Sequence, residues 1–261
     1  MPMEKGSLVL VDYTAKVKDT NEVFETTREE EAKKTDLYDP TRKYEPRLVS
    51  VGDAWVLKGL DEALAKAGVG EKLNVEVMPD KGFGERDPGK VRMLPQRKLG
   101  EKADEVRVGD VVEMDDNRTG IVRYIGSGRV QVDFNHRFAG KTLLYDVNVV
   151  KKLEADNDKI AALMKRRIPI EDSKVKVNLA GANLEMELPE ETYLAEGLQI
   201  IKRAIANDVF KFVPAVKSLK FVENYAAPTP AEETKKTVEE EKPASAAAAK
   251  TEAKPAEAKQ A

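Results

Sequence analysis

Three stretches of the sequence place an apolar residue at every second position, and this alternation limits the possible folds more than any other feature. The stretches are 9–17, 73–77 and 143–149. In an extended strand, successive side chains point to opposite faces, so a period of two predicts strands that are buried on one face only. Shorter extended segments are expected at 22–27 and 48–51.

A short helix is expected at 59–68, where acidic residues come early and Gly68 follows the end. The charged stretch 28–46 is expected to form a surface loop. Because the alternating segments have one polar face each, they are typical of an antiparallel sheet with one solvated side. The pattern therefore predicts an α+β fold in which an antiparallel sheet wraps on one short helix.

A second region, 88–139, interrupts this unit before its last strand. Short strands are expected at 106–114, 120–125 and 129–134, joined by turns that contain Asp, Asn, Ser and Gly. We expect a small inserted β-barrel. The spacing of its strands is similar to that of small SH3-like barrels found in ribosome-associated proteins.

A third region, 155–226, has its own helix and strand signals and is expected to be an α+β domain. Asp158 is expected to cap a helix, and the alternation at 175–188 predicts a hairpin. Apolar residues then step along one helical face over 194–209. A closing strand is expected at 218–223.

The last 35 residues, 227–261, contain no aromatic residue and one large aliphatic residue. Such a segment buries too little apolar surface to offset the entropy lost on ordering, which predicts a disordered tail. The expected division is therefore a first domain of 1–87 and 140–154, an inserted domain of 88–139, a C-terminal domain of 155–226, and the tail.

The composition excludes several kinds of chemistry. The chain has no cysteine and one histidine, His136, so it has no disulfide, no thiol nucleophile and no metal centre with several His or Cys ligands. Its 44 Lys and Arg against 47 Asp and Glu give a net charge of −3, which does not favour nucleic acid as a partner. No window approaches the ~20 apolar residues of a membrane span. We expect a cytoplasmic protein with no metal site and no membrane contact.

Two local signals are interpreted as structural. Residues 84–90 have the spacing of a phosphate-binding loop, but Val91 stands where a Ser or Thr would hold magnesium, and Pro88 removes a backbone donor. His136 has no neighbours of metal-ligand type, which favours a polar loop residue that bonds the backbone. No serine lies in a nucleophile-elbow motif.

What remains is an ordered series of short motifs. In chain order they are Val11-Asp12-Tyr13-Thr14, Val23-Phe24-Glu25-Thr26-Thr27, Val56-Leu57-Lys58-Gly59-Leu60-Asp61, Pro79-Asp80-Lys81-Gly82-Phe83-Gly84 and Ala139-Gly140-Lys141-Thr142-Leu143-Leu144-Tyr145. The series resembles the FKBP-type peptidyl-prolyl cis–trans isomerases. The insert is similar to the SlyD-like branch, in which a chaperone domain called insert-in-flap interrupts the loop over the active site. The third region is similar to the long archaeal form.

This resemblance implies a prolyl pocket and an enzyme without a cofactor, since rotation about an Xaa–Pro bond breaks no covalent bond. The pocket residues that it implies are Tyr13, Phe24, Glu25, Val56, Leu57, Leu60, Phe83 and Tyr145. The family commonly has Asp at Glu25, Trp at Leu60 and Tyr at Phe83, so macrolide affinity and absolute rate stay open. Without the resemblance, strand alternation alone would explain these residues as ordinary core.

The insert implies a chaperone activity, namely weak binding of unfolded or nascent polypeptides. The residues expected to contact such chains are Val91, Met93, Leu94, Phe134 and Phe138. Each is equally explained as core of a small β domain. The alternative function is a non-catalytic binding module that docks on ribosomes, RNA or unfolded chains; the ribosome or RNA version is drawn from the SH3-like spacing and from Lys165-Arg166-Arg167. The hairpin and long helix of the third region offer a surface for a homodimer.

Overall fold

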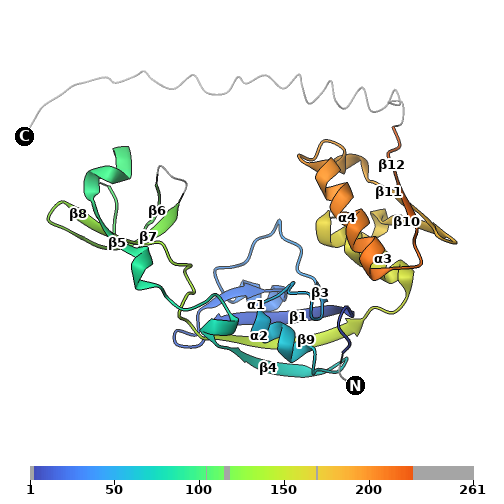
Figure 1. Cartoon of the computed structure of the whole chain (residues 1–261), viewed down its shortest axis with the longest axis horizontal. Coiled ribbons are helices and arrows are strands. Elements are labelled where there is room, and N and C mark those ends of the chain that lie inside the picture. The colour runs from blue at the N-terminus through green and yellow to red at the C-terminus, as the bar shows by residue number, and fades with distance from the viewer. Residues whose placement is uncertain (1–2, 104, 115–117, 169, 226–261) are drawn as a thin grey trace, which may run out of the picture.

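The computed structural model describes residues 3–103, 105–114, 118–168 and 170–225. Over these residues the chain forms three sheets, which we call the sheets of the first unit, the insert and the third unit. The insert and the third unit lie at opposite ends of the first sheet (Figure 1). The expected tail and the expected turn at 115–117 lie outside the described residues.

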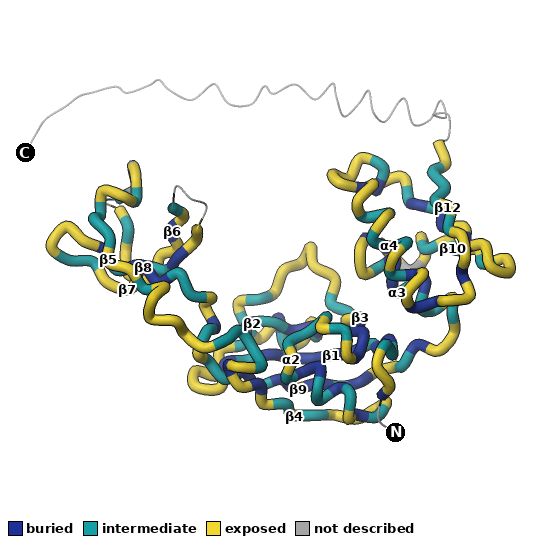
Figure 2. Tube along the Cα trace, viewed as in Figure 1, coloured by how far each residue is buried: buried dark blue, intermediate teal, exposed yellow. Residues whose placement is uncertain are grey.

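The first unit is an antiparallel sheet packed on one helix, as the alternation predicts. Its strands are β1 (Leu8–Val17), β2 (Val23–Thr26), β3 (Arg47–Ser50), β4 (Lys72–Val77) and β9 (Leu143–Lys152). The order is β2-β1-β9-β4, and β3 pairs with β1. Alternate residues of β1 and β9 are buried against helix α2 (Lys58–Leu64), which contributes Leu60 and Leu64 to the core. Figure 2 shows this burial along both central strands.

One part of the first unit differs from the sequence prediction. The charged stretch expected to be a loop contains a short helix, α1 (Glu29–Lys33), with three acidic residues in its first turn. The Glu29 and Lys33 side chains form an ion pair of 2.6 Å, and Ala32 is fully buried. A helix of five residues is too short to show an apolar periodicity, so the sequence did not predict it.

The insert is a four-stranded antiparallel sheet with the order β5-β8-β7-β6. Its strands are β5 (Val91–Pro95), β6 (Val111–Glu113), β7 (Thr119–Gly126) and β8 (Arg129–Asp133). Among the described residues β5 and β6 do not pair with each other, so the expected closed barrel is instead an open sheet. The Ser127-Gly128 turn was predicted correctly, and both residues have positive φ, as a tight hairpin requires.

The insert differs from the sequence prediction at two strands, one that was not predicted and one that is shorter than expected. β5 was not predicted, although it pairs with β8 from Val91 to Pro95. The strand expected at 106–114 begins only at Val111, because the chain turns at Gly109, whose φ is 101°. The buried core of the insert consists of Val112, Val122, Val130 and Val132.

The third unit combines two helices with a three-stranded sheet. The elements are α3 (Asp156–Arg167), β10 (Lys176–Ala180), β11 (Asn183–Glu187), α4 (Leu198–Phe212) and β12 (Ser218–Val222). β10 and β11 form the expected hairpin, and β12 pairs with β11 in parallel. Asp158 lies inside the first turn of α3 and is not its cap, since Ala155 holds that position. α4 begins four residues later than expected, after Gly197 with φ 72°.

The first and third units share part of their core. Leu8, Leu48 and Trp55 of the first unit pack in the same apolar cluster as α3 and α4. A cavity of about 570 Å³ lies between β3, β9 and α3, where its lining includes Arg47 and Arg166. The third unit is therefore in direct contact with the strand and the loop that precede α2.

Candidate active site

Five aromatic side chains from five separate segments pack together in the first unit, and we call them the aromatic site. They are Tyr13, Phe24, Phe83, Phe138 and Tyr145. The ring centroids of Phe24 and Phe138 are 4.4 Å apart, and those of Tyr13 and Tyr145 are 5.8 Å apart. Phe24 and Tyr145 meet edge to face at 6.3 Å. Four of these five rings were predicted as pocket residues from the sequence.

The Tyr13 hydroxyl is held by a charged pair. It donates to Glu25 Oε1 at 2.8 Å and accepts a hydrogen bond from Arg47 at 2.8 Å, while the same Arg47 nitrogen is 2.9 Å from Glu25 Oε1. Burial and then the nearby Glu25 carboxylate raise the pKa of Tyr13 to about 12. The phenol therefore stays protonated at neutral pH, and its hydroxyl is already engaged.

Arg47 was missed by the sequence prediction. It lies 34 positions from Tyr13, and the pairing of β3 with β1 brings them together. The available signal was a charged residue directly before the buried Leu48-Val49-Ser50 of the same strand. Arg47 itself is exposed, so the burial pattern gave no reason to expect a particular partner for it.

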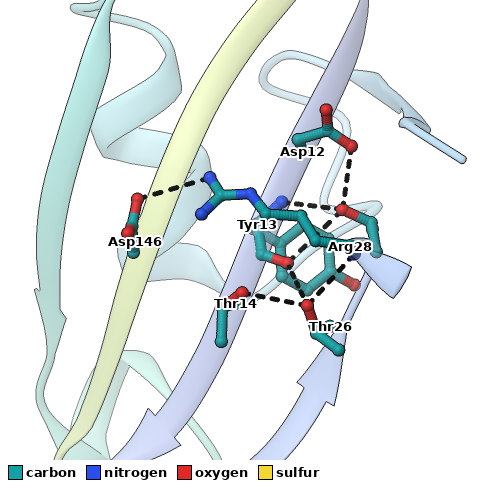
Figure 3. A network of polar contacts seen from close by, with 7 residues as sticks. Asp12, Tyr13, Thr14, Thr26, Arg28 and Asp146 are labelled. Atoms are coloured by element: carbon teal, nitrogen blue, oxygen red, sulfur yellow. Dashed lines mark hydrogen bonds and ion pairs between the residues drawn. The ribbon is translucent and has the colours of Figure 1, made fainter. Parts of the chain in front are cut away.

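The backbone of Tyr13 is fixed by threonines of β2 and the residue after it. Thr27 Oγ1 accepts a hydrogen bond from the Tyr13 amide at 2.9 Å and donates to Asp12 at 3.0 Å, and Thr26 Oγ1 donates to the Tyr13 carbonyl at 3.2 Å. Figure 3 shows this network on β1. Arg28 extends it to Asp146 on β9 at 3.3 Å. These bonds fix the position of the Tyr13 ring relative to β2 and β9.

Tyr145 has the opposite arrangement at its hydroxyl. The residue is 5 % exposed, yet its hydroxyl forms no hydrogen bond with the described residues. No described side-chain oxygen or nitrogen is both fully buried and unpaired, so this hydroxyl reaches the surface of the site. Burial, followed by the charge of Glu25, raises the pKa of Tyr145 well above its ordinary value. The site thus contains a protonated hydroxyl that is free to donate to a ligand.

The remaining predicted pocket residues also lie at this cluster. Leu60 is 2 % exposed in the first turn of α2, and Val56 and Leu57 precede that helix, half-buried against the same core. Phe83 follows the short turn Pro79–Lys81 and is half-buried. The structure therefore brings all eight predicted pocket residues into one region.

His136 has a larger place in this region than the sequence indicated. Its ring stacks on Phe83, with the centroids 4.1 Å apart and the planes 13° apart. Its Nδ1 also accepts a hydrogen bond from the backbone amide of Phe138 at 3.3 Å, which is the backbone bond expected for it. The stacking was not predicted, because the two residues are 53 positions apart.

The residues predicted to contact unfolded chains fall into two groups. Val91, Met93 and Leu94 lie on the edge strand β5, where Met93 is 46 % exposed, and Phe134 packs against the core of the insert. Phe138 is different: it is 6 % exposed and belongs to the aromatic site of the first unit. Of the two roles expected for it at the exit of the insert, the structure shows a place in the core, and a contact with unfolded chain stays a prediction.

This arrangement defines a class of non-covalent sites. Apolar rings surround one free hydroxyl, and among the described residues no group of three His, Asp or Glu side chains could hold a metal ion. No described helix is long and apolar enough to cross a membrane. Such a site can bind an apolar ring, orient a carbonyl by a hydrogen bond and exclude water.

Comparison with known proteins identifies the family. The sequence model of the FKBP-type peptidyl-prolyl cis-trans isomerases matches residues 2–150, and a second one, described as FKBP26 C-terminal, matches 156–226. The chain belongs to the FKBP-type peptidyl-prolyl cis-trans isomerases. The expected family, enzyme class and α+β fold are thus confirmed.

Three relatives show how far the similarity extends. A short-type peptidyl-prolyl cis-trans isomerase of Methanocaldococcus jannaschii is 33 % identical over 147 residues, which are 56 % of this chain and 92 % of the relative. An FKBP-type 16 kDa isomerase of Escherichia coli is 29 % identical over 153 residues, 57 % and 93 % of the two chains. The SlyD isomerase of Helicobacter pylori is 26 % identical over 130 residues, 49 % and 70 %.

Proposed function

We propose that the aromatic site binds the proline ring of an Xaa–Pro peptide and accelerates its cis–trans rotation without covalent chemistry. The rings of Phe24, Phe83 and Tyr145 would surround the pyrrolidine, with Val56, Leu57 and Leu60 below it. Tyr13 is occupied by Glu25 and Arg47 and would serve as a fixed wall. The observation that carries the proposal is the free hydroxyl of Tyr145 among buried rings.

The energetics favour such a site. The rotation loses amide resonance against a barrier of about 18–20 kcal/mol. A twisted amide has less charge separation than a planar one, so apolar surroundings destabilise the ground state more than the transition state. A hydrogen bond from Tyr145 to a substrate carbonyl outside the rotating amide would orient the peptide without strengthening the resonance of the Xaa–Pro bond. Neither a nucleophile nor a metal ion takes part.

The test is the exchange rate of a proline peptide, measured by NMR at equilibrium. We expect the full chain to accelerate exchange, and the pair Phe83→Ala with Tyr145→Ala to remove most of the acceleration. Tyr124→Ala, an exposed ring on β7, is the matched control and keeps the wild-type rate. No acceleration by the intact protein, or full activity in the double variant, contradicts the proposal.

We further propose that the insert, as a separate domain, holds unfolded or nascent chain near this site. Its two edge strands carry exposed apolar side chains, Met93 on β5 and Val111 on β6, which are 46 % and 68 % exposed. An unpaired strand edge can accept an extended chain. Holding the chain there raises the effective concentration of its prolines at the aromatic site.

One experiment distinguishes the binding of unfolded chain by the insert from catalysis at the aromatic site. Met93→Lys with Val111→Lys is expected to slow catalysed refolding of a proline-limited protein and to leave the exchange of a short peptide unchanged. The control is Met78→Lys, an exposed methionine of the first unit that follows β4. Equal refolding rates in the edge variant and wild type would refute this part.

We propose a homodimer through the third unit as well. Leu194, Ile200 and Phe210 are 98 %, 76 % and 43 % exposed there, so a second copy that covers them would remove apolar surface from water. Light scattering on the full chain is expected to give a dimer mass, and Leu194→Glu with Ile200→Glu a monomer mass. A monomer for the wild-type chain would rule the dimer out.

The alternative of a ribosome- or RNA-binding module has little support. Its basic triplet is paired within the protein: Lys165 lies 3.1 Å from Glu45, and Arg166 and Arg167 lie 3.6 and 2.9 Å from Asp208. These ion pairs hold the three side chains against carboxylates of the protein, so a phosphate would have to compete for them. Co-sedimentation with ribosomes at ~50 mM salt tests it, and retention there would revive the alternative.

A further inference from the structure

The segment between β3 and α2, residues 51–57, carries Val56 and Leu57 of the proposed proline-binding site. Its backbone is unusual, because Ala54 is a non-glycine residue with φ 55° and Gly52 has φ 79°. L-residues avoid this left-handed region, so the conformation persists only where neighbouring groups hold it. We call these residues the 51–57 segment.

One anchor of the 51–57 segment comes from the first unit itself. Asp61 of α2 is 9 % exposed, and its carboxylate accepts hydrogen bonds from the backbone amides of Gly52 at 2.7 Å and Ala54 at 3.3 Å. Ser50 also donates to Asp53 at 2.5 Å. The inner side of the segment is thereby tied to the helix that it leads into.

The other anchor comes from the third unit. Lys211 of α4 forms an ion pair of 2.8 Å with Asp53. Phe212 meets the Trp55 ring edge to face at 5.4 Å. The Arg166 guanidinium of α3 lies 3.7 Å from the centroid of the same indole. Trp55 consequently packs against both apolar cores at once.

The charges around Asp53 agree with this geometry. Burial alone would raise the pKa of the Asp53 carboxyl, but the hydrogen bonds from Lys211 and Ser50 outweigh it and lower the pKa. Asp53 is 12 % exposed at its side chain and Lys211 is 54 % exposed. The Asp53 carboxylate is therefore largely shielded from water while Lys211 is not, and such a partly buried ion pair is screened less than one at an open surface.

We propose that Lys211, Phe212 and Arg166 are positioning residues for the isomerase reaction, acting through Asp53 and Trp55 to fix Val56 and Leu57. The inference rests on the proposed role of Val56 and Leu57 in binding proline. A small displacement of the segment would move both side chains relative to the aromatic site, and geometric errors of this kind lower catalysis at a distance. The third unit is then part of the active enzyme and not an appended module.

The experiment uses full-length variants and one intrinsic reporter. Trp55 is the only tryptophan of the chain, so its emission reports the contact directly. We expect Lys211→Ala and Arg166→Ala each to lower kcat/KM for a short proline peptide about three- to tenfold. The loss should appear mainly in KM, together with a red shift of the Trp55 emission.

The controls separate positioning from a general structural role. Lys211→Arg keeps the ion pair and is expected to restore wild-type KM. Arg203→Ala removes an exposed cation of the same helix that forms no hydrogen bond or ion pair with the described residues, and it should change neither KM nor emission. In a double-mutant cycle, Asp53→Asn and Lys211→Ala should be non-additive, since each removes the same contact.

Two results would overturn the inference. The first is an unchanged kcat/KM in Lys211→Ala and Arg166→Ala although the Trp55 emission has shifted. The second is strict additivity in the cycle of Asp53 and Lys211. The proposed function still stands after either result, provided that the wild-type chain accelerates exchange and the double variant Phe83→Ala with Tyr145→Ala does not. A wild-type chain without acceleration refutes the proposed function instead.

Discussion

Replacing Phe138 by Ala distinguishes two interpretations of this residue. From the sequence, Phe138 was expected at the exit of the insert, either as a contact for unfolded chain or as core, and the structure buries it in the aromatic site. Its ring is 6 % exposed and lies 4.4 Å from Phe24 and 5.5 Å from Phe83, measured between centroids. Removal of a buried phenylalanine ring costs about 3–5 kcal/mol, from lost transfer energy and the cavity left behind.

We expect the loss of stability in Phe138→Ala to lie in that range. The rings of Phe24 and Phe83 contact Phe138, and Phe24 lies on the paired strand β2, so the site cannot collapse freely around the cavity. With about 4–8 °C of melting temperature per kcal/mol for a unit of ~100 residues, the first unit should melt at least about 12 °C lower. Peptide isomerisation should fall too, since Phe24 and Phe83 lose their common support. The assay is thermal unfolding followed by circular dichroism, with peptide exchange measured well below the transition.

Phe134→Ala is the comparison, because Phe134 lies only four positions away but packs in the core of the insert. We expect it to leave peptide exchange unchanged. If Phe138→Ala reduced only the holding of unfolded chain, with melting and peptide exchange as in wild type, the assignment of Phe138 to the aromatic site would be refuted.

Three further predictions concern the rest of the first unit. The pKa of Tyr13 is raised from 10.0 to about 12, so the stability that the protonated phenol contributes is complete below pH 10 and is lost as the pH rises through 12. The free energy of unfolding measured against pH should show this loss, and the loss should be smaller in Tyr13→Phe. Gly140→Ala should destabilise by about 1 kcal/mol or more in urea unfolding, because φ is 73° and the new Cβ would lie 3.2 Å from Arg86. Asp61→Ala should raise KM for the peptide, since the amides of the 51–57 segment lose their acceptor; an unchanged KM would show that the segment keeps its shape without it.

The alternating strands were predictable because each has one face in the core. In β1 the buried positions follow the period of two almost without interruption, and the apolar residues of the sequence stand at these positions. β5 was not predictable in this way, because Arg92 and Met93 are both exposed while Leu94 is packed. The insert thus shows where the pattern fails, at a short edge strand with few buried residues.

In the candidate site, too, some residues could be predicted from the sequence and others could not. Its eight predicted residues were identifiable because the family resemblance fixes their order along the chain. Arg47, His136 and Asp61 could not be assigned their contacts from the sequence, since each partner is distant along the chain or is a backbone amide. Only the pairing of strands and the path of the 51–57 segment bring these groups together.

The most direct test of the central claim is the peptide exchange rate of Tyr145→Phe, which removes one oxygen and keeps the ring. A hydrogen bond worth about 0.5–1.5 kcal/mol predicts a two- to tenfold lower kcat/KM, with unfolding as in wild type and no effect of Tyr124→Phe. An exchange rate in Tyr145→Phe equal to that of the wild-type enzyme would contradict the role given to the free hydroxyl.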